Sequence, residues 1–144
     1  MQRLQTLLAA IWVGILVAVG AIAAPSLFAM LDRTVAGLAA GRIFAVEAQV
    51  SMVLAMLLFF MERRRARDQA QQPGTSVMST ELLLVLGALF ATVLGHFALQ
   101  PMIEAAKAGQ GRWSFGALHA ASSSMFVLKG ALVLALAWRL TSRR

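Results

Sequence analysis

Four long apolar stretches constrain the fold more than any other feature of this sequence. They cover residues 7–30, 43–61, 82–102 and 115–138. Each is close to or longer than the roughly 20 residues that a helix needs to cross a bilayer. Only helices and closed barrels can cross lipid, because every backbone N–H and C=O group needs a partner within the protein there. The stretches lack the alternating pattern of barrel strands. They therefore predict an all-α membrane protein, with residues 1–144 forming one domain, an antiparallel bundle of four transmembrane helices.

The composition agrees with a membrane protein and excludes several functions. Hydrophobic residues make up 60% of the chain and charged residues 13%, whereas soluble proteins carry about 25% charged residues. The absence of cysteine excludes disulfides and thiolate metal sites. The net charge of +7 comes from arginines that flank the apolar stretches, where such residues contact anionic lipid. The expected partner is therefore the lipid bilayer, and nucleic-acid binding is not expected.

The basic residues near the helix ends predict the orientation of the chain. One group lies near the two termini and between the second and third stretches: Arg3, Arg63, Arg64, Arg65, Arg67, Arg139, Arg143 and Arg144. The other group lies in the two remaining loops: Arg33, Arg42, Lys107 and Arg112. Eight against four favours the cytoplasmic side for both termini and for a linker over residues 63–79. Ser79 or Thr80 is the expected N-cap of the third helix, and Asp32 is the expected N-cap of the approach to the second.

The same features suggest a location. The short linkers, the lack of cysteine and the arginine bias suggest a bacterial inner membrane. The first stretch contains Ala21-Ile22-Ala23, which has the small-residue pattern of a signal-peptide cleavage site. Because its apolar run is too long for a signal peptide, we interpret it as a retained first helix.

Small residues recur at four-residue spacing on three of the four predicted helices. The sets are Ala10, Gly14 and Ala18, then Gly87, Ala91 and Gly95, and finally Gly116, Ala120 and Ser124. Such stripes let helix backbones approach closely. They are consistent with a tight monomeric bundle, or with a homo-oligomer formed through one of the small-residue faces.

Polar residues inside the apolar stretches carry most of the functional information, because ionisable groups in a bilayer tend to face the protein interior or a cavity. The candidate binding residues are Glu47, His96, Gln100, His119, Ser122, Ser123 and Lys129. Helical spacing groups them on one face of each of three helices. We therefore expect Glu47, His96 and His119 to converge near the outer side of the bundle, as candidate metal ligands, with Lys129 beneath them.

A packing explanation is available for most of these residues. An intramembrane histidine more often hydrogen-bonds to a neighbouring helix than binds a ligand, and serines often bond to their own helix. Lys129 is harder to explain, because a lysine near a helix centre costs about 2.5–3.5 kcal/mol. A partner such as Glu47 or Ser51 would offset that cost, or the amine is neutral. The tryptophans, among them Trp12, are interpreted as packing and interfacial residues.

Several short segments carry a family resemblance. They are Pro25-Ser26-Leu27-Phe28, Leu31-Asp32-Arg33, Ala36-Gly37, Arg42-Ile43-Phe44, Leu99-Gln100-Pro101, Phe115, His119 and Ser122-Ser123. In this order they resemble the transmembrane protein 205-like family, which has bacterial members filed as a domain of unknown function. The resemblance covers nearly the whole chain and implies a four-helix membrane protein. Its eukaryotic members have been linked to tolerance of platinum drugs and to vesicle traffic. One departure is Phe126, where eukaryotic members tend to have an asparagine, and this weakens any polar role carried over to that turn.

Three classes of function stay open. The first is a non-enzymatic membrane protein that handles or senses a small solute or a metal-bearing compound at Glu47, His96 and His119. The second is an assembly or scaffolding subunit whose polar cluster is structural. The third is a redox subunit in which His96 and His119 ligate haem or a transition metal. The sequence has no recognisable catalytic triad, phosphate-binding glycine loop or HExxH motif, so we do not expect an enzyme.

Overall fold

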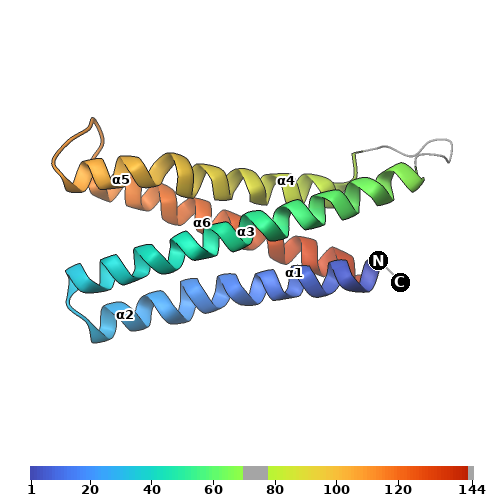
Figure 1. Ribbon diagram of the computed structural model, residues 1–144, viewed down its shortest axis with the longest axis horizontal. Coiled ribbons are helices and arrows are strands. Elements are labelled where there is room, and N and C mark those ends of the chain that lie inside the picture. The colour runs from blue at the N-terminus through green and yellow to red at the C-terminus, as the bar shows by residue number, and fades with distance from the viewer. Residues whose placement is uncertain (70–77, 143–144) are drawn as a thin grey trace.

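The computed structural model describes residues 1–69 and 78–142, which are helical apart from short connections and contain no strand. The elements, in which η marks a π-helical segment, are α1 (Gln2–Val17), η1 (Ala18–Ala23), α2 (Ala24–Met30), α3 (Arg33–Gln69), α4 (Thr80–Thr92), η2 (Val93–Ala98), α5 (Leu99–Lys107) and α6 (Phe115–Ser142). Within the described residues they form 4 spans that are long and apolar enough to cross a membrane (Figure 1). The predicted all-α fold with four transmembrane helices is confirmed.

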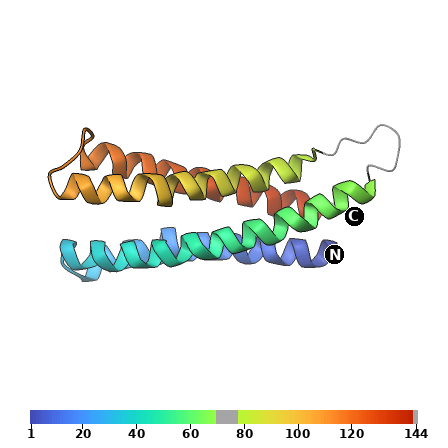
Figure 2. The ribbon, with the colours of Figure 1, turned by 45° about the horizontal axis from the view of Figure 1, so that its top comes forward.

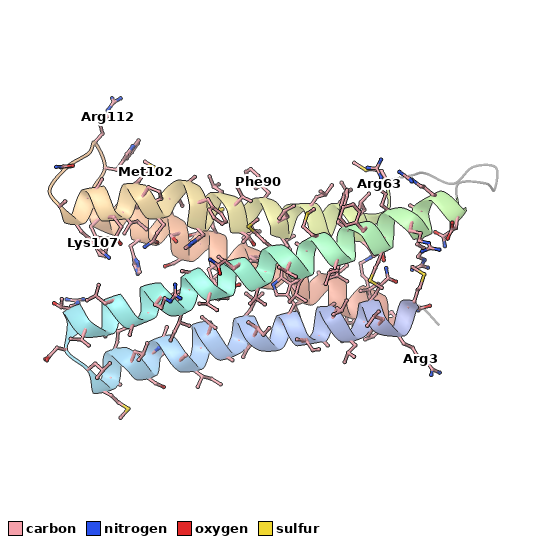
Figure 3. All side chains as sticks on the ribbon, viewed as in Figure 1. Arg3, Arg63, Phe90, Met102, Lys107 and Arg112 are labelled. Carbon is pink, nitrogen blue, oxygen red and sulfur yellow. The ribbon has the colours of Figure 1, made fainter. Side chains whose placement is uncertain are left out.

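The spans run up and down and pack in a ring. α1 contacts α3, α3 contacts α4, α4 contacts α6, and α6 returns to α1. The start of α1, the end of α3, the start of α4 and the end of α6 lie at the same end of the molecule (Figures 1 and 2). Arg3 and Arg63 lie at this end, whereas Lys107 and Arg112 lie at the opposite end (Figure 3). The two groups of basic residues that predicted the orientation are thus represented at opposite ends of the spans.

The helices extend beyond the apolar stretches that predicted them. α3 begins at Arg33 rather than near residue 43, and it continues to Gln69, because backbone hydrogen bonding continues through polar flanks that leave the bilayer. The predicted linker over residues 63–79 is therefore wrong in its first part, which is helical, and residues 70–77 lie outside the described residues. Ser79 is confirmed as the N-cap of α4, since its side chain accepts a hydrogen bond from the Leu82 N–H at 3.1 Å. At Asp32 the backbone carbonyl accepts from the N–H of Ala36 at 2.8 Å.

The first and third spans share an irregularity. Each contains a π-helical segment, η1 or η2, and a proline follows soon after it, Pro25 in α2 and Pro101 in α5. Proline has no backbone N–H and its ring disturbs the preceding helical turn. Wider π turns and prolines are both recognised causes of local bending in helices. The two spans therefore deviate from a regular α-helix at corresponding places.

The core lies between the spans, and apolar side chains also cover the outside. Trp12, Leu58 and Leu136 are fully buried. Phe90 and Val127 are exposed by 63% and 70%, and Phe90 projects outward in Figure 3. Large exposed apolar residues on every span are what a lipid environment accommodates, so the surface agrees with the predicted membrane location.

The three small-residue sets occupy different positions. A Cβ atom at Gly87 would lie 3.1 Å from Leu132, and one at Gly95 would lie 3.2 Å from Met125. The stripe on α4 and η2 therefore lets these segments approach α6 closely. The sets on α1 and on α6 are exposed, so they face away from the core.

Candidate functional site

A buried ion pair between α3 and α6 is the main polar feature of the membrane interior. The Lys129 Nζ atom lies 2.7 Å from Oε1 and 2.8 Å from Oε2 of Glu47. The two side chains are only 5% and 2% exposed. Glu47 is therefore the partner of Lys129, and it is one of the two candidate partners that the sequence suggested. In the low dielectric of this interior the mutual attraction is strong, but it must offset the loss of water around both charges.

Two further residues complete the hydrogen bonds of this pair. Ser51, one helical turn after Glu47, donates a short hydrogen bond to the Glu47 carboxylate. The Trp12 indole N–H of α1 donates to the Ser51 hydroxyl at 2.7 Å. Trp12 and Ser51 are each 0% exposed. The carboxylate thus accepts from a lysine on α6 and a serine on α3, and α1 fixes the serine.

Aromatic rings enclose the lysine side of the pair. The Lys129 Nζ atom lies 5.1 Å from the centre of the Phe126 ring, within the range of a cation–π contact. Phe126 in turn meets Phe44 of α3 in an edge-to-face contact with ring centres 5.2 Å apart. Phe126 thus supports the ammonium group with its ring face.

The histidines are not equivalent members of this site. His96 in η2 is half-buried, and its ring meets that of Phe97 edge to face with centres 5.0 Å apart. His119 is exposed on α6, and its ring stacks on Phe115 with centres 5.6 Å apart. Among the described residues no group of three His, Cys, Asp or Glu side chains could hold a metal ion. The predicted convergence of Glu47, His96 and His119 as metal ligands is therefore wrong. A haem ligated by the two histidines stays a prediction.

The remaining predicted residues lie apart from the ion pair. Gln100 donates to Glu104 at 3.2 Å, near the end of α5. Ser122 donates to the backbone carbonyl of Gly95 at 3.3 Å, so it links α6 to η2. Ser123 is exposed. These three residues serve helix contacts or the surface rather than the buried pair.

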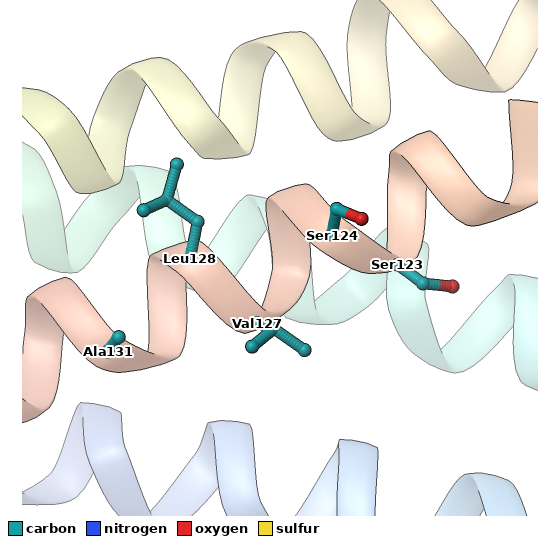
Figure 4. A pocket seen from close by; sticks show the side chains of 5 residues that line it. All are labelled: Ser123, Ser124, Val127, Leu128 and Ala131. Carbon is teal, nitrogen blue, oxygen red and sulfur yellow. The ribbon is translucent and has the colours of Figure 1, made fainter.

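Hollows lie on the outside of the spans. A cavity of about 250 Å³ between the first span and α3 is open to the outside, and its lining includes apolar residues such as Val19, Val46 and Val50, together with Arg42 and Glu47. A shallower depression of about 540 Å³ lies along α6 (Figure 4), and its lining consists of Ser123, Ser124, Val127, Leu128 and Ala131. Only the first hollow includes a member of the ion pair.

A second polar group lies near the termini and was not predicted. The Gln5 amide donates to Glu62 at 3.0 Å, and Arg139 donates to Glu81 at 2.8 Å. Both carboxylates are only 2% exposed. Because these glutamates lie just beyond the apolar stretches, no sequence pattern separates them from solvated flanking residues. Trp12 was also missed as part of the ion-pair site. Its place inside an apolar stretch was the available signal, since a buried indole N–H normally has a partner.

Comparison with known proteins gives a family without an assigned activity. No curated protein matches the chain, and no solved structure matches it either. A family model described as "Domain of unknown function (DUF4149)" matches residues 7–112. This match includes the first three spans and therefore Glu47, Ser51, Trp12 and His96, whereas Lys129 lies beyond it. Since the match covers most of the chain, the protein belongs to the DUF4149 family.

Proposed function

We propose that the protein is a multi-pass membrane protein that handles a small solute without catalysis, with the Glu47–Lys129 pair as its polar binding point. The observation that carries this proposal is the cavity between the first span and α3, which reaches Glu47. The hydrogen bonds of the pair are made within the protein. A solute in the cavity would therefore compete with Lys129 for the Glu47 carboxylate, or interact with that carboxylate from the cavity.

Energetics also support a use beyond packing. Apolar residues of similar volume often replace a buried ion pair without loss of stability, and sometimes with a gain. Ionisable residues inside a membrane domain commonly mark substrate or ion pathways. Retaining Glu47 and Lys129 in the interior is therefore more easily explained by a functional requirement than by stability alone.

The cavity limits the size and nature of the solute. At about 250 Å³ it is smaller than the roughly 300–1,000 Å³ of pockets for drug-sized ligands. Its walls are mostly aliphatic, with Arg42 and Glu47 as the charged members. Resemblance to the transmembrane protein 205-like family, whose eukaryotic members have been linked to platinum drugs, adds metal-bearing compounds to the candidates.

The proposal predicts that a small solute raises the unfolding temperature of the protein in lipid nanodiscs. The test panel consists of amino acids, organic amines, carboxylates and platinum complexes. At 100 times its dissociation constant, a bound solute should stabilise the fold by about 2.7 kcal/mol. Val46→Phe should abolish this effect by filling the cavity without touching the ion pair.

Val53→Phe is the matched control for that experiment. Val53 lies on the same helix and is exposed, but it does not line the cavity. Its solute response should equal that of the unmodified protein. A solute that stabilises the Val46→Phe variant as strongly as the unmodified protein would disprove binding in this cavity.

An assembly subunit is the second candidate function. It is favoured by the outward position of the small-residue sets on α1 and α6, which leaves two surfaces where another helix could approach closely. Such a helix could come from a second copy of the chain or from another membrane protein. If no solute in the panel changes the unfolding temperature and the protein co-purifies with a stoichiometric partner in mild detergent, this candidate replaces the first.

The proposed setting is the inner membrane of a bacterium, with both termini in the cytoplasm. This predicts the labelling of single cysteines introduced at Asp68 and Gln110, which are both exposed and lie at opposite ends of the spans. An impermeant maleimide should label Gln110→Cys in intact spheroplasts, and Asp68→Cys only after the membrane is opened. The chain has no cysteine of its own, so the background is low. The reverse pattern would invert the orientation.

A further inference from the structure

The two halves of the chain have the same order of elements. The N-terminal hairpin, from α1 to α3, contains a helix, a π-helical segment, a short helix and a long returning helix. The C-terminal hairpin, from α4 to α6, repeats this order. Pro25 and Pro101 occupy the same place, in the short helix that follows the π-helical segment. Both hairpins also begin at the same end of the molecule (Figure 1).

The long returning helices correspond residue by residue. Glu47 and Lys129 are 82 positions apart, and the first residues of α3 and α6, Arg33 and Phe115, have this same separation. With this spacing every buried residue of α6 falls on a buried residue of α3. The pairs are Ala36 with Leu118, Glu47 with Lys129, Ser51 with Val133, Leu54 with Leu136, and Leu58 with Leu140.

The first helices of the hairpins correspond in the same way. When α1 is placed on α4 so that Pro25 falls on Pro101, every buried residue of α1 falls on a buried residue of α4. The pairs are Gln5 with Glu81, Ala9 with Val85, Trp12 with Ala88, and Leu16 with Thr92. Because buried positions are set by packing, agreement along both helices means that the hairpins bury the same faces.

The contacts between elements follow the same symmetry. α1 packs on α3 as α4 packs on α6, and α3 packs on α4 as α6 packs on α1. In the part of the chain that the structure describes, α3 and α6 lie on a diagonal and their Cα atoms do not approach within 8 Å. Two equivalent residues that touch each other must lie close to a two-fold axis. Glu47 touches Lys129 and Phe44 touches Phe126, so both pairs lie on this axis.

We propose that the chain is two versions of one hairpin, related by an approximate two-fold axis along the helices, and that opposite charges at the shared axial position specify their pairing. Parallel repeats of this kind are known in membrane proteins. Two N-terminal hairpins would place two glutamates on the axis, and two C-terminal hairpins would place two lysines there. Like charges in the interior are strongly unfavourable, so the charges select the mixed pair. This proposal is independent of any solute.

Charge exchange in the full chain tests the proposal. Glu47→Lys and Lys129→Glu should each lower the unfolding temperature in detergent, because each places two like charges on the axis. The double variant, with both substitutions, should recover more than half of the loss, because equivalent positions can exchange roles. Recovery should stay incomplete, since Ser51 and Trp12 correspond to Val133 and Ala88, which cannot support a carboxylate on α6.

A matched control has the same net charge as the double variant, but its new glutamate lies away from the axis. The variant with Glu47→Lys and Arg112→Glu should be no more stable than Glu47→Lys alone, because Arg112 is exposed in the loop before α6. A second readout uses co-expression of the two single-substitution chains with different tags. Exchange of hairpins between them restores both ion pairs, so the two chains should co-purify in equal amounts, whereas two unmodified chains should exchange far less. No recovery in the double variant, or equal co-purification of unmodified chains, would overturn the proposal.

A cross-link keeps the proposal testable if the charge variants do not fold. Phe44→Cys with Phe126→Cys should react with a short bis-maleimide to give an internal link between the hairpins. After cleavage of the chain in the segment over residues 70–77, that link should hold the two fragments together. Phe44→Cys with Val127→Cys is the control, since Val127 is 70% exposed and points away from the axis. Equal linking of both pairs contradicts an axial position for Phe44 and Phe126.

Discussion

Replacing Lys129 by methionine is expected to lower the free energy of unfolding by about 3–5 kcal/mol, because it leaves the Glu47 carboxylate buried without its counter-charge. The two side chains are only 5% and 2% exposed, so water cannot take the place of the ammonium group. Reversible unfolding in mixed detergent micelles measures the loss. Lys107→Met is the control. Lys107 also pairs with a glutamate, Glu104, but both side chains are largely exposed, and such pairs contribute about 0–1 kcal/mol.

A double variant separates the contribution of the ion pair to stability from its contribution to solute binding. Glu47→Leu together with Lys129→Met removes both charges, so most of the lost stability should return. If the pair binds a solute, this stable variant should have lost the solute response. A loss in the Lys129→Met variant as small as that in the Lys107→Met variant would mean that Glu47 is either uncharged or accessible to water.

The fold could be predicted because the bilayer imposes simple requirements. Apolar stretches of sufficient length, and the need for internal backbone hydrogen bonds, give four helices whatever their packing. Glu47 could also be named as one candidate partner of Lys129, since it is the carboxylate within an apolar stretch. What a single sequence does not contain is the rotation of each helix about its own axis.

His119 illustrates the limit. It was grouped with Lys129 on one face of the last helix, but between these residues an ideal helix stops about 80° short of a whole number of turns. That rotation leaves Lys129 buried and His119 exposed. The two-fold relation was hidden for a different reason. The hairpins share buried positions rather than residue types, as Trp12 with Ala88 and Glu47 with Lys129 show, and burial is known only once the helices are packed.

Trp12→Ala is expected to cause the second large loss, about 3–5 kcal/mol, since it removes a fully buried aromatic side chain from the core. Trp12 is 0% exposed and contributes to the main cluster of buried residues together with Leu58 and Val133. Trp138→Ala is the control, because Trp138 is 74% exposed. Its substitution should change the unfolding free energy by less than about 0.5 kcal/mol.

Trp12→Phe distinguishes the two roles of this residue. Phenylalanine keeps most of the packing but removes the N–H group that holds the Ser51 hydroxyl at 2.7 Å. If Trp12 only fills space, this variant should be nearly as stable as the unmodified protein. If Trp12 orients Ser51 toward Glu47, Trp12→Phe should lower the free energy of unfolding by about 1–3 kcal/mol. The same substitution should cost less in a protein that already carries Ser51→Ala, because the effects of coupled residues are not additive. Additive losses in that cycle would show that α1 supports the bundle without organising the ion pair.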